Sequence, residues 1–290
     1  MKVYWFFKNF NLVPRDLKIK KDVFQNMKKT ICLNMIVKNE SHIIESTLQN
    51  ILDHIHIDYW VICDTGSTDN TIDIIETFFR MKQIPGEIHQ DEWKDFGYNR
   101  SKALEYTFNK TDYVFIFDAD DLIHGAFNLP EDITKDMYYI PFEKPTSYHR
   151  AILVTNRKRW KYNGVLHEYI VNMEPIVGEE YLDGDYYVES RRLGNRNQNP
   201  DKYLHDAIVL EKGFEDETED IWLKNRYAYY CAQSFQDAGM RETAIKWYEK
   251  TLTLDYSPQY KYCACIRGGD CYHKLKQYDK ALYLWGKSYG

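Results

Sequence analysis

Three carboxylates follow directly on a short apolar run at residues 113–121, which read Tyr-Val-Phe-Ile-Phe-Asp-Ala-Asp-Asp. An unbroken run of aromatic and β-branched residues predicts a buried central strand. Because side chains alternate along a strand, we expect Asp118 and Asp120 to project to one side and Asp121 to the other. Two carboxylates on one face repel each other, and hard oxygen donors of this kind suit Mg²⁺ or Mn²⁺. Taken alone, an Asp-x-Asp pair fits a solvated acidic turn better, so the surrounding sequence decides.

A further acid ends a second apolar run. Residues 59–63 predict a buried strand, and Asp64 follows it and leads into the small polar residues of the stretch 65–70. An acid in this position can accept hydrogen bonds from a base or a ribose, and Gly66 lets the backbone approach a ligand closely. The chain contains neither Gly-x-Gly-x-x-Gly nor Gly-x₄-Gly-Lys-Ser/Thr, so neither a dinucleotide fingerprint nor a P-loop is indicated.

The segments around these acids alternate between strand and helix patterns. Strands are predicted at residues 30–37, 59–63, 87–90 and 113–117; amphipathic helices are predicted after Ser41, after Asn70 and over residues 99–108. Ser41 is the expected N-cap of the first helix. Such alternation implies parallel strands with right-handed crossovers. We therefore expect an α/β domain with a mostly parallel central sheet whose carboxyl edge carries the acids.

Four segments taken together resemble one known family. They are Leu33–Glu40, Asp64–Thr71, Asn99-Arg100 and Phe117–Asp121. In order and approximate spacing they look like family 2 glycosyltransferases with the GT-A fold, over roughly residues 30–200. The Asp-x-Asp motif is weakly specific, whereas the series of four is strong. The resemblance implies a hexosyltransferase-like enzyme that uses a nucleotide-sugar donor, with a UDP-sugar as the first expectation. It also implies Mn²⁺ or Mg²⁺ on the donor diphosphate, and usually inversion at the anomeric carbon.

The resemblance also suggests roles for individual residues. Asp64 would contact the nucleoside, Asp118 the ribose or metal, and Asp120 the metal. Trp160–Glu168 resembles the family's Trp-x-x-x-Gly-x-x-His-Glu segment, in which His167 offers an imidazole to metal or diphosphate and Glu168 an acid–base group. Glu168 is the preferred catalytic base and Asp121 a contender; a purely structural His167-Glu168 pair is the alternative. The expected donor-binding residues are Asn39, Glu40, Asp64, Asn99, Arg100, Asp118, Arg191 and Arg196, and the expected metal ligands are Asp118, Asp120 and His167.

A basic loop containing glycine occupies residues 191–197. Its arginines could close over a diphosphate and exclude water. A solvated linker is an equal alternative, because Asn-Gln-Asn-Pro follows at residues 197–200 and is typical of a domain boundary.

From Asp201 onward the periodicity is helical. Residues 225–253 and 259–287 each predict a pair of short helices, and an aromatic–Ala spacing recurs between them at an offset of 37 residues, near the ~34 of tetratricopeptide repeats. Both units lack the full consensus of that motif. Two repeats are marginal alone, so we expect them to pack on the catalytic domain and to offer a surface for a protein partner or a second copy of the chain. The predicted domains are an N-terminal extension (1–28), a GT-A domain (29–200) and a tetratricopeptide-like region (201–290).

Composition limits the remaining possibilities. The net charge of −6 argues against a general nucleic-acid binder, and no segment reaches the ~20 apolar residues of a membrane span. The six cysteines show no common zinc spacing, and they favour a reducing, cytoplasmic location. Two other functions stay open: a nucleotidyltransferase, disfavoured because the loop at residues 38–41 lacks glycine, and a non-catalytic adaptor. The acceptor class, whether glycan, peptide or protein, is also open.

Overall fold

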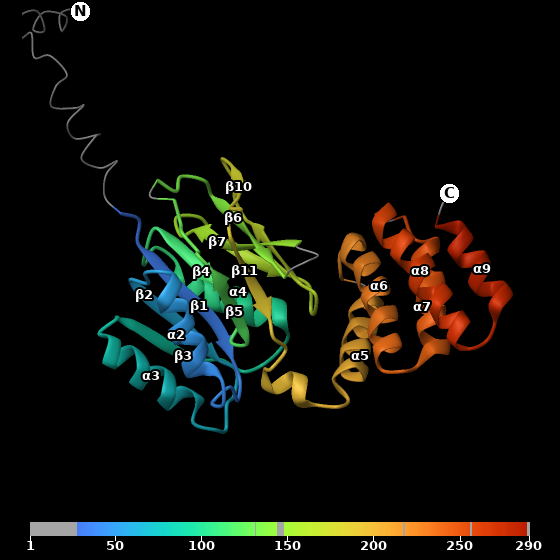
Figure 1. The fold of residues 1–290 in the computed structure, drawn as a ribbon, viewed down its shortest axis with the longest axis horizontal. Coiled ribbons are helices and arrows are strands. Elements are labelled where there is room, and N and C mark those ends of the chain that lie inside the picture. Colours follow the sequence, from blue (N-terminus) through green and yellow to red (C-terminus); the bar gives the residue numbers. More distant parts are fainter. Residues whose placement is uncertain (1–27, 131, 144–147, 217, 256, 289–290) are drawn as a thin grey trace, which may run out of the picture.

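The computed structural model of this chain describes residues 28–130, 132–143, 148–216, 218–255 and 257–288. The predicted N-terminal extension therefore lies outside the described residues, apart from Lys28. Figure 1 shows an α/β part built around a twisted sheet and, beside it, a group of helices that contains the C-terminal residues. Among the described residues, no helix combines the length and the apolar character that crossing a membrane requires.

The α/β part is organised around one mixed sheet. Its strands are β1 (Ile31–Val37), β2 (Tyr59–Asp64), β3 (Gly86–Gln90), β4 (Tyr113–Ile116), β5 (Asp121–Gly125), β6 (Met137–Phe142), β7 (Tyr148–Thr155), β10 (Glu179–Tyr181) and β11 (Tyr186–Ser190). In the described part of the chain their order is β3-β2-β1-β4-β7-β6-β11-β5, and β10 pairs with β6. Among the described residues of this sheet, five strand pairs are parallel and three antiparallel. The predicted α/β class with a mostly parallel sheet is confirmed.

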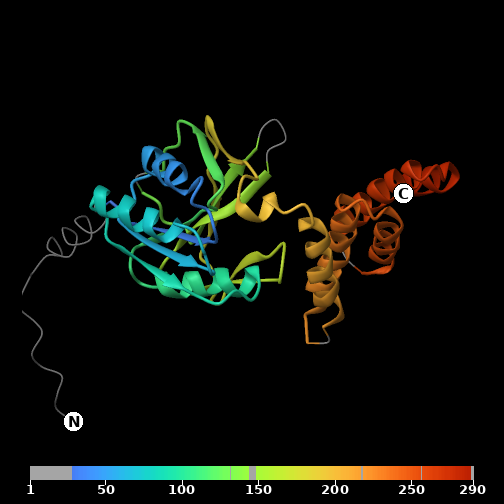
Figure 2. The same ribbon diagram turned by 90° about the horizontal axis from the view of Figure 1, so that it is seen from below.

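Helices cover both faces of the sheet. They are α2 (Ile44–His54), α3 (Thr71–Lys82) and α4 (Phe96–Thr107). Figure 2 shows α2 and α3 on one side of strands β1 and β2 and α4 on the other. The alternation along β4 explains this arrangement, because Phe115 joins the core beneath α2 and α3, whereas Val114 and Ile116 pack with Leu104 of α4. Both faces of the central strands β1, β2 and β4 are buried, as their mainly apolar sequences predict.

Two local predictions are wrong. Ser41 does not cap the first helix, because the chain first makes a turn in which the amides of Ile43 and Ile44 both donate to the carbonyl of Glu40, and α2 begins only at Ile44. The third helix begins at Phe96 instead of Asn99, because the side chain of Asp95 accepts a hydrogen bond from the amide of Tyr98 and caps the helix there.

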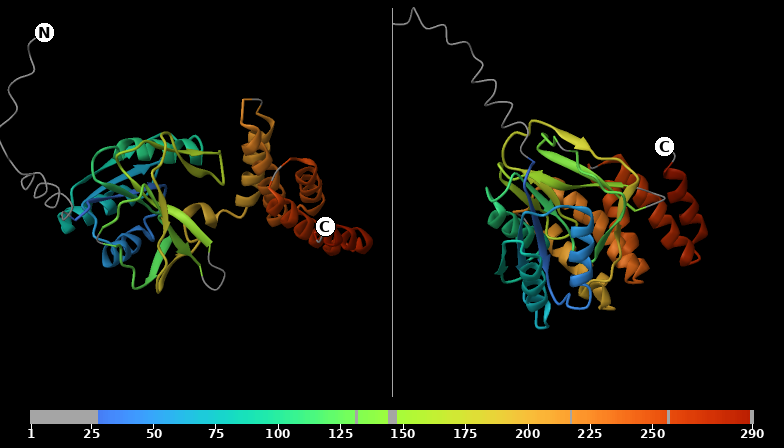
Figure 3. Two further views of the ribbon diagram at one scale, coloured as in Figure 1. Left: turned by 90° about the horizontal axis from the view of Figure 1, so that it is seen from above. Right: turned by 60° about the vertical axis from the view of Figure 1, so that its left-hand side comes forward.

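The helical region consists of helices in sequence, each packed on the next. Its described members are α5 (Lys202–Glu215), α6 (Ile221–Asp237), α7 (Arg241–Thr253), α8 (Pro258–Lys274) and α9 (Tyr278–Lys287), and a short 3₁₀ helix, η1 (Asn195–Gln198), precedes them. The starts of α6 and α8 lie 37 residues apart, as do those of α7 and α9. The predicted recurrence of a helix pair therefore has a structural counterpart at the same interval. Figure 3 shows the pairs leading away from the sheet.

The helical region packs on the α/β part through a small hairpin. This hairpin consists of β8 (Trp160–Asn163) and β9 (Tyr169–Asn172). Leu166, in the hairpin loop, belongs to the apolar cluster of the helical region. The amide of Val165 donates to the hydroxyl of Tyr227 (3.0 Å), and Arg226 Nε donates to the carbonyl of His167 (2.9 Å). These hydrogen bonds with the α/β part come from α6, so packing of the second helix pair on that part stays a prediction.

Candidate functional site

The acidic cluster lies in a turn between two strands. β4 ends at Ile116, and the amide of Asp121 donates to the carbonyl of Asp118 (3.2 Å) before β5 begins at Asp121. Strand alternation therefore does not govern these side chains, and the predicted pairing of Asp118 with Asp120 on one face is wrong. Asp118 and Asp121 instead share one guanidinium, that of Arg150 on β7, at 3.2 Å and 3.6 Å.

Two arginines hold the carboxylate of Asp118. Arg100 Nη2 lies 2.6 Å from Asp118 Oδ1, and Arg150 Nη2 lies 3.2 Å from Oδ2. Burial would raise the pKa of Asp118, but the charges of Arg100 and Arg150 outweigh it and hold that pKa well below its usual range. Asp118 is therefore an ionised carboxylate with strong partners on both oxygens.

Asp121 is the most deeply buried acid of the cluster, with 1% of its surface exposed. Its Oδ1 is buried without a hydrogen-bond partner among the described residues. Burial foremost, and then the charges of Asp118 and Asp120, raise the pKa of Asp121 well above its usual value. A carboxyl group with a raised pKa keeps its proton to higher pH than an ordinary aspartate, which makes it a candidate for proton transfer.

Asp120 faces the basic loop. Its Oδ2 accepts hydrogen bonds from the amide of Gly194 (3.0 Å) and from Asn197 Nδ2 (3.3 Å). The same loop donates the amide of Asn195 to Glu40 (3.2 Å). Burial foremost and then Asp120 raise the pKa of Glu40 to about 7, although the Asn195 amide acts in the opposite direction. Loop 191–197 thus bridges Asp120 and Glu40 through its backbone.

The two arginines predicted in that loop are engaged by the protein. Arg191 donates from Nε to the carbonyl of Asp120 (3.0 Å) and from Nη2 to Thr47 Oγ1 (2.9 Å). Arg196 pairs with Asp206 of α5 and lies over the ring of Phe96, 4.7 Å from its centroid. Arg191 therefore fixes the loop against the acidic turn, whereas Arg196 faces the helical region.

Asp64 ends β2 at the same edge of the sheet. Its Oδ2 accepts hydrogen bonds from the amides of Gly66 (3.0 Å) and Ser67 (2.9 Å), whereas its Oδ1 is buried without a partner among the described residues. Asn39 shapes the same loop, since its Oδ1 accepts a hydrogen bond from the amide of Thr68 (2.7 Å). An unpaired, buried carboxylate oxygen costs free energy that a ligand with an N–H or O–H group would offset.

Helix α4 carries the residue that connects the site. Arg100 donates from Nε to Glu168 Oε1 (2.7 Å) as well as from Nη2 to Asp118, and its side chain is 10% exposed. The neighbouring Asn99 uses its amide group locally, bonding to the carbonyl of Glu92 (3.1 Å) and the amide of Lys94 (3.0 Å). Arg100 thus joins Glu168 to the acidic cluster, and Asn99 holds the loop before the helix.

Close packing fixes α4 in this position, and a single methyl group should disturb it. A Cβ added to Gly97 would collide with the carbonyl oxygen of Gly164. We expect Gly97→Ala to lower the free energy of unfolding by about 1–3 kcal/mol, measured by urea denaturation. The matched control is Gly286→Ala in α9, where a Cβ meets nothing within 4 Å and alanine should raise helix stability by up to about 1 kcal/mol. A Gly97 variant as stable as the control would contradict the expectation.

His167 points away from Glu168. Its ring stacks on that of Tyr230 in α6, with centroids 3.9 Å apart and an interplanar angle of 13°. Burial foremost, and then the charges of Arg226, Arg196 and Lys202, lower the pKa of His167 to about 3. The imidazole is therefore neutral and packed between the two parts of the molecule, and its role as a metal ligand stays a prediction.

The structure thus places the predicted site residues in three groups. Asp118, Asp121, Arg100 and Glu168 form one group, Glu40, Asp120 and loop 191–197 a second, and Asn39 and Asp64 a third at the end of β2. No sequence pattern indicated Arg150 or Tyr162, whose ring centroid lies 5.6 Å from the Arg100 guanidinium carbon. Arg150 is one basic residue in an otherwise ordinary strand, so only its pairing across the sheet reveals it.

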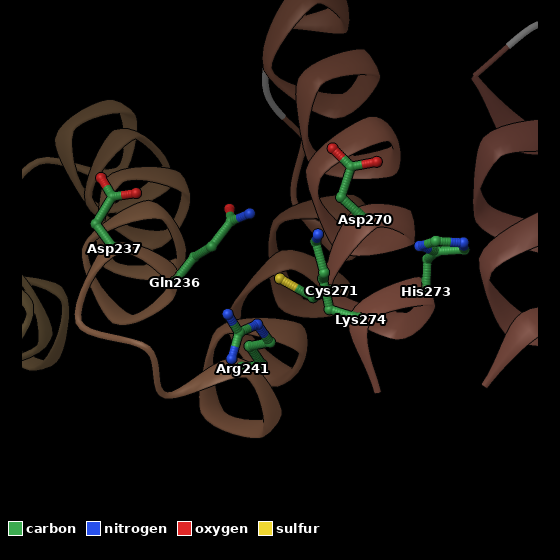
Figure 4. Close-up of a pocket in the computed structure, with 7 residues that line it drawn as sticks. All are labelled: Gln236, Asp237, Arg241, Asp270, Cys271, His273 and Lys274. Carbon is green, nitrogen blue, oxygen red and sulfur yellow. The ribbon is translucent and has the colours of Figure 1, made fainter. Parts of the chain in front are cut away.

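A cavity of about 450 Å³ lies elsewhere, among the helices. Figure 4 shows Gln236 and Cys271 reaching into it from opposite sides. Its other lining residues are Asp237, Arg241, Asp270, His273 and Lys274. Both acidic and basic side chains line this cavity. No residue predicted to belong to the functional site is among its lining residues.

Residues 32–135 match the model of the family described as Glycosyl transferase family 2. The matched segment, just over a third of the chain, carries Asp64, Arg100 and the acidic cluster. No curated protein matches the chain.

Several solved structures are similar. S. aureus TarS 1–349 in complex with UDP-GlcNAc shares 14% identity at a TM-score of 0.43 over 90% of this chain and 91% of that one. The mannosyltransferase PcManGT from Pyrobaculum calidifontis, in complex with GDP-Man and Mn²⁺, shares 13% sequence identity with a TM-score of 0.46. The match covers 90% of this chain and 86% of that one. Glucosyl-3-phosphoglycerate synthase from Mycobacterium tuberculosis shares 18% sequence identity with a TM-score of 0.27. The match covers 40% of this chain and 41% of that one. At these TM-scores the likenesses establish neither the fold nor the function of this chain.

Proposed function

We propose that residues 29–200 form a glycosyltransferase domain that moves a sugar from a nucleotide-sugar donor to an acceptor nucleophile. The observation that carries the proposal is the coincidence of the family match with the acidic edge of the sheet, where β2 and β4 flank β1. Ligands of open α/β sheets bind beyond the carboxyl ends of such strands. Asp64 Oδ1 is positioned to accept a hydrogen bond from the nucleoside, and a UDP-sugar is the first donor to test.

We propose that donor binding includes Mn²⁺ or Mg²⁺ beside Asp120 and Asp118. The described ranges contain no group of three or more His, Cys, Asp or Glu side chains arranged to hold a metal. Such a group is not required, because these cations bind through one or two carboxylates together with substrate phosphates. Asp120 fits this role, since both hydrogen bonds to its carboxylate reach Oδ2 and leave Oδ1 available. Asp118 would have to exchange an arginine contact for the cation, because Arg100 and Arg150 hold its two oxygens. When bound, the cation would stabilise charge on the departing diphosphate.

Glu168 is the proposed base that removes the proton from the acceptor hydroxyl, with inversion at the anomeric carbon. The Arg100 guanidinium orients Glu168 and ties it to Asp118, so the base is fixed relative to the donor side of the site. Loop 191–197 covers the acidic turn and would exclude water from it.

For the helical region, we propose that its two helix pairs are tetratricopeptide-like and bind a protein partner or a second copy of the chain. Their 37-residue recurrence supports this reading. The proposed domain boundaries are the predicted ones, with the second near residue 200, just before α5 begins.

The decisive experiment is a screen of nucleotide sugars with Mn²⁺ for release of nucleoside diphosphate. We expect release to fall about a hundredfold or more when excess chelator is added or when Asp120 is replaced by alanine, because several kcal/mol of charge stabilisation is lost. The control Asp73→Ala alters an exposed acid of α3 and should leave release unchanged. Metal-independent release would overturn the metal assignment, and release of pyrophosphate would indicate nucleotidyl transfer instead.

A further inference from the structure

A group of cations lies where the α/β part meets the helices. We name it the cationic wall; its members are Arg192, Arg196, Lys202 and Arg226. Arg192 belongs to the basic loop and Arg196 to η1, whereas Lys202 begins α5 and Arg226 lies in the second turn of α6. The carboxylates facing them are Asp206, paired with Arg196, and Asp237, within electrostatic reach of Lys202 and Arg192. Arg267 also acts on Asp237, so among the described residues cations outnumber the acids named here, in a chain whose net charge is −6.

The wall is held in place by aromatic side chains. The Arg226 guanidinium lies over Tyr230, 4.9 Å from the ring centroid, and donates from Nη1 to the hydroxyl of Tyr260 (2.6 Å). Arg196 lies over Phe96, and Lys202 Nζ lies 4.4 Å from the ring centroid of Tyr203. Rings beside cations restrict the motion of those cations and favour their charged form.

The cations also act unfavourably on one another. Burial lowers the pKa of Lys202 and, although Asp206 opposes the change, Arg196 and Arg192 lower it further. Like charges held together cost free energy that a bound anion would offset. The arrangement therefore favours a ligand with negative charge.

The wall adjoins the proposed catalytic base. His167 stacks on Tyr230 beneath Arg226, and the next residue, Glu168, extends the other way to Arg100. On the other side, Phe96, beneath Arg196, lies one turn of α4 before Arg100. The wall is therefore connected to Glu168 in two ways, along the chain through His167 and along α4 through Phe96.

We infer that the cationic wall binds the acceptor, and that the acceptor carries a phosphate or carboxylate group that the wall holds while a hydroxyl of the same molecule lies at Glu168. This inference rests on the proposed function and names the substrate class of the same site. It gives the helical region a role in the reaction, because Lys202 and Arg226 belong to α5 and α6.

The test measures binding of three matched probes by calorimetric titration of the full chain. The probes are a methyl hexoside, the same hexoside with a 6-phosphate, and the corresponding uronate. We expect at least one charged probe to bind about tenfold or more tightly than the neutral one, as charge-assisted hydrogen bonds predict, and the preference to weaken with salt. The double variant Arg192→Glu/Lys202→Glu should lose the preference. The control Lys212→Glu/Lys246→Glu carries the same charge change on exposed positions of α5 and α7 and should retain it.

Each outcome is decisive. Preference for the phosphate or for the uronate supports the inference and identifies the anionic group. Equal binding of all three probes, no binding of any, or a preference that survives the double variant overturns it. Release of nucleoside diphosphate, measured in parallel, tests the proposed function separately. If the chain releases nucleoside diphosphate but binds charged and neutral probes equally, the proposed function stands and the inference about the acceptor is wrong.

Discussion

Replacing Arg100 by alanine is expected to lower the free energy of unfolding by about 3–5 kcal/mol, measured by urea denaturation at neutral pH. The guanidinium is the partner of two carboxylates, Asp118 and Glu168, whose side chains are 23% and 12% exposed. Removing the cation leaves two charges close together in a poorly solvated place. Breaking a buried pair on one side costs far more than the intact pair contributes.

Two control variants separate this effect from a general loss of charge. Arg157→Ala removes an arginine that is 69% exposed and pairs with Asp112 at the surface, and it should cost less than about 1 kcal/mol. Arg100→Lys keeps the charge but not the planar fork that reaches both carboxylates, so its cost should fall between the two. If Arg100→Ala lowered the free energy of unfolding no more than Arg157→Ala does, the ion pairs of Arg100 with Asp118 and Glu168 would be unimportant for stability.

The strands that carry the site were predictable because each is a run of mainly apolar residues. β1, β2 and β4 are buried on both faces, and the one polar residue inside them before the final Asp64 of β2 is Asn34 of β1, which is buried and donates to the carbonyls of Val61 and Ala103. The first polar residues after these runs therefore mark the edge of the sheet, which is why Asp64 and the acidic cluster were found. Helices α2 and α3 followed from their apolar spacing.

The parts of the site that were not predicted depend on contacts between residues far apart in the chain. Arg150 meets Asp118 because β7 runs antiparallel to β4, with Leu153 opposite Phe115, and no local pattern specifies that pairing. The grouping of the three acids was mispredicted for a related reason, since β4 ends one residue early and the chain turns. Loop 191–197 reaches Asp120 and Glu40 through backbone amides, which leave no signal in side-chain types.

His167 shows how one motif can divide between two roles. Sequence reasoning treated His167 and Glu168 as partners in one site, but adjacent side chains diverge, and here a positive φ of 53° at His167 accompanies the divergence. Glu168 points to Arg100 and His167 packs on the helices. The pair therefore couples the position of the proposed base to the position of the helical region.

Glu168→Gln is expected to reduce sugar transfer by about 10²–10⁴-fold, the usual contribution of a positioned general base. Glutamine has nearly the same shape and keeps an oxygen that can accept the hydrogen bond from Arg100 Nε, so the fold should survive. The measurement is the rate of transfer at saturating donor, with the unfolding midpoint recorded for the same sample. Glu105→Gln, at an exposed position on the same helix as Arg100, should transfer at the unaltered rate.

The contending base, Asp121, predicts a different pattern. Asp121 is buried and its pKa is raised, so asparagine should replace it without leaving a new buried charge. If Glu168 is the base, Asp121→Asn should slow transfer much less than Glu168→Gln does. The opposite ranking would assign proton removal to Asp121, which lies on β5 beside Arg150, and would leave Glu168 as the residue that holds Arg100 against Asp118. Because both substitutions preserve side-chain shape, the ranking of the two rates distinguishes the chemical role from the structural one.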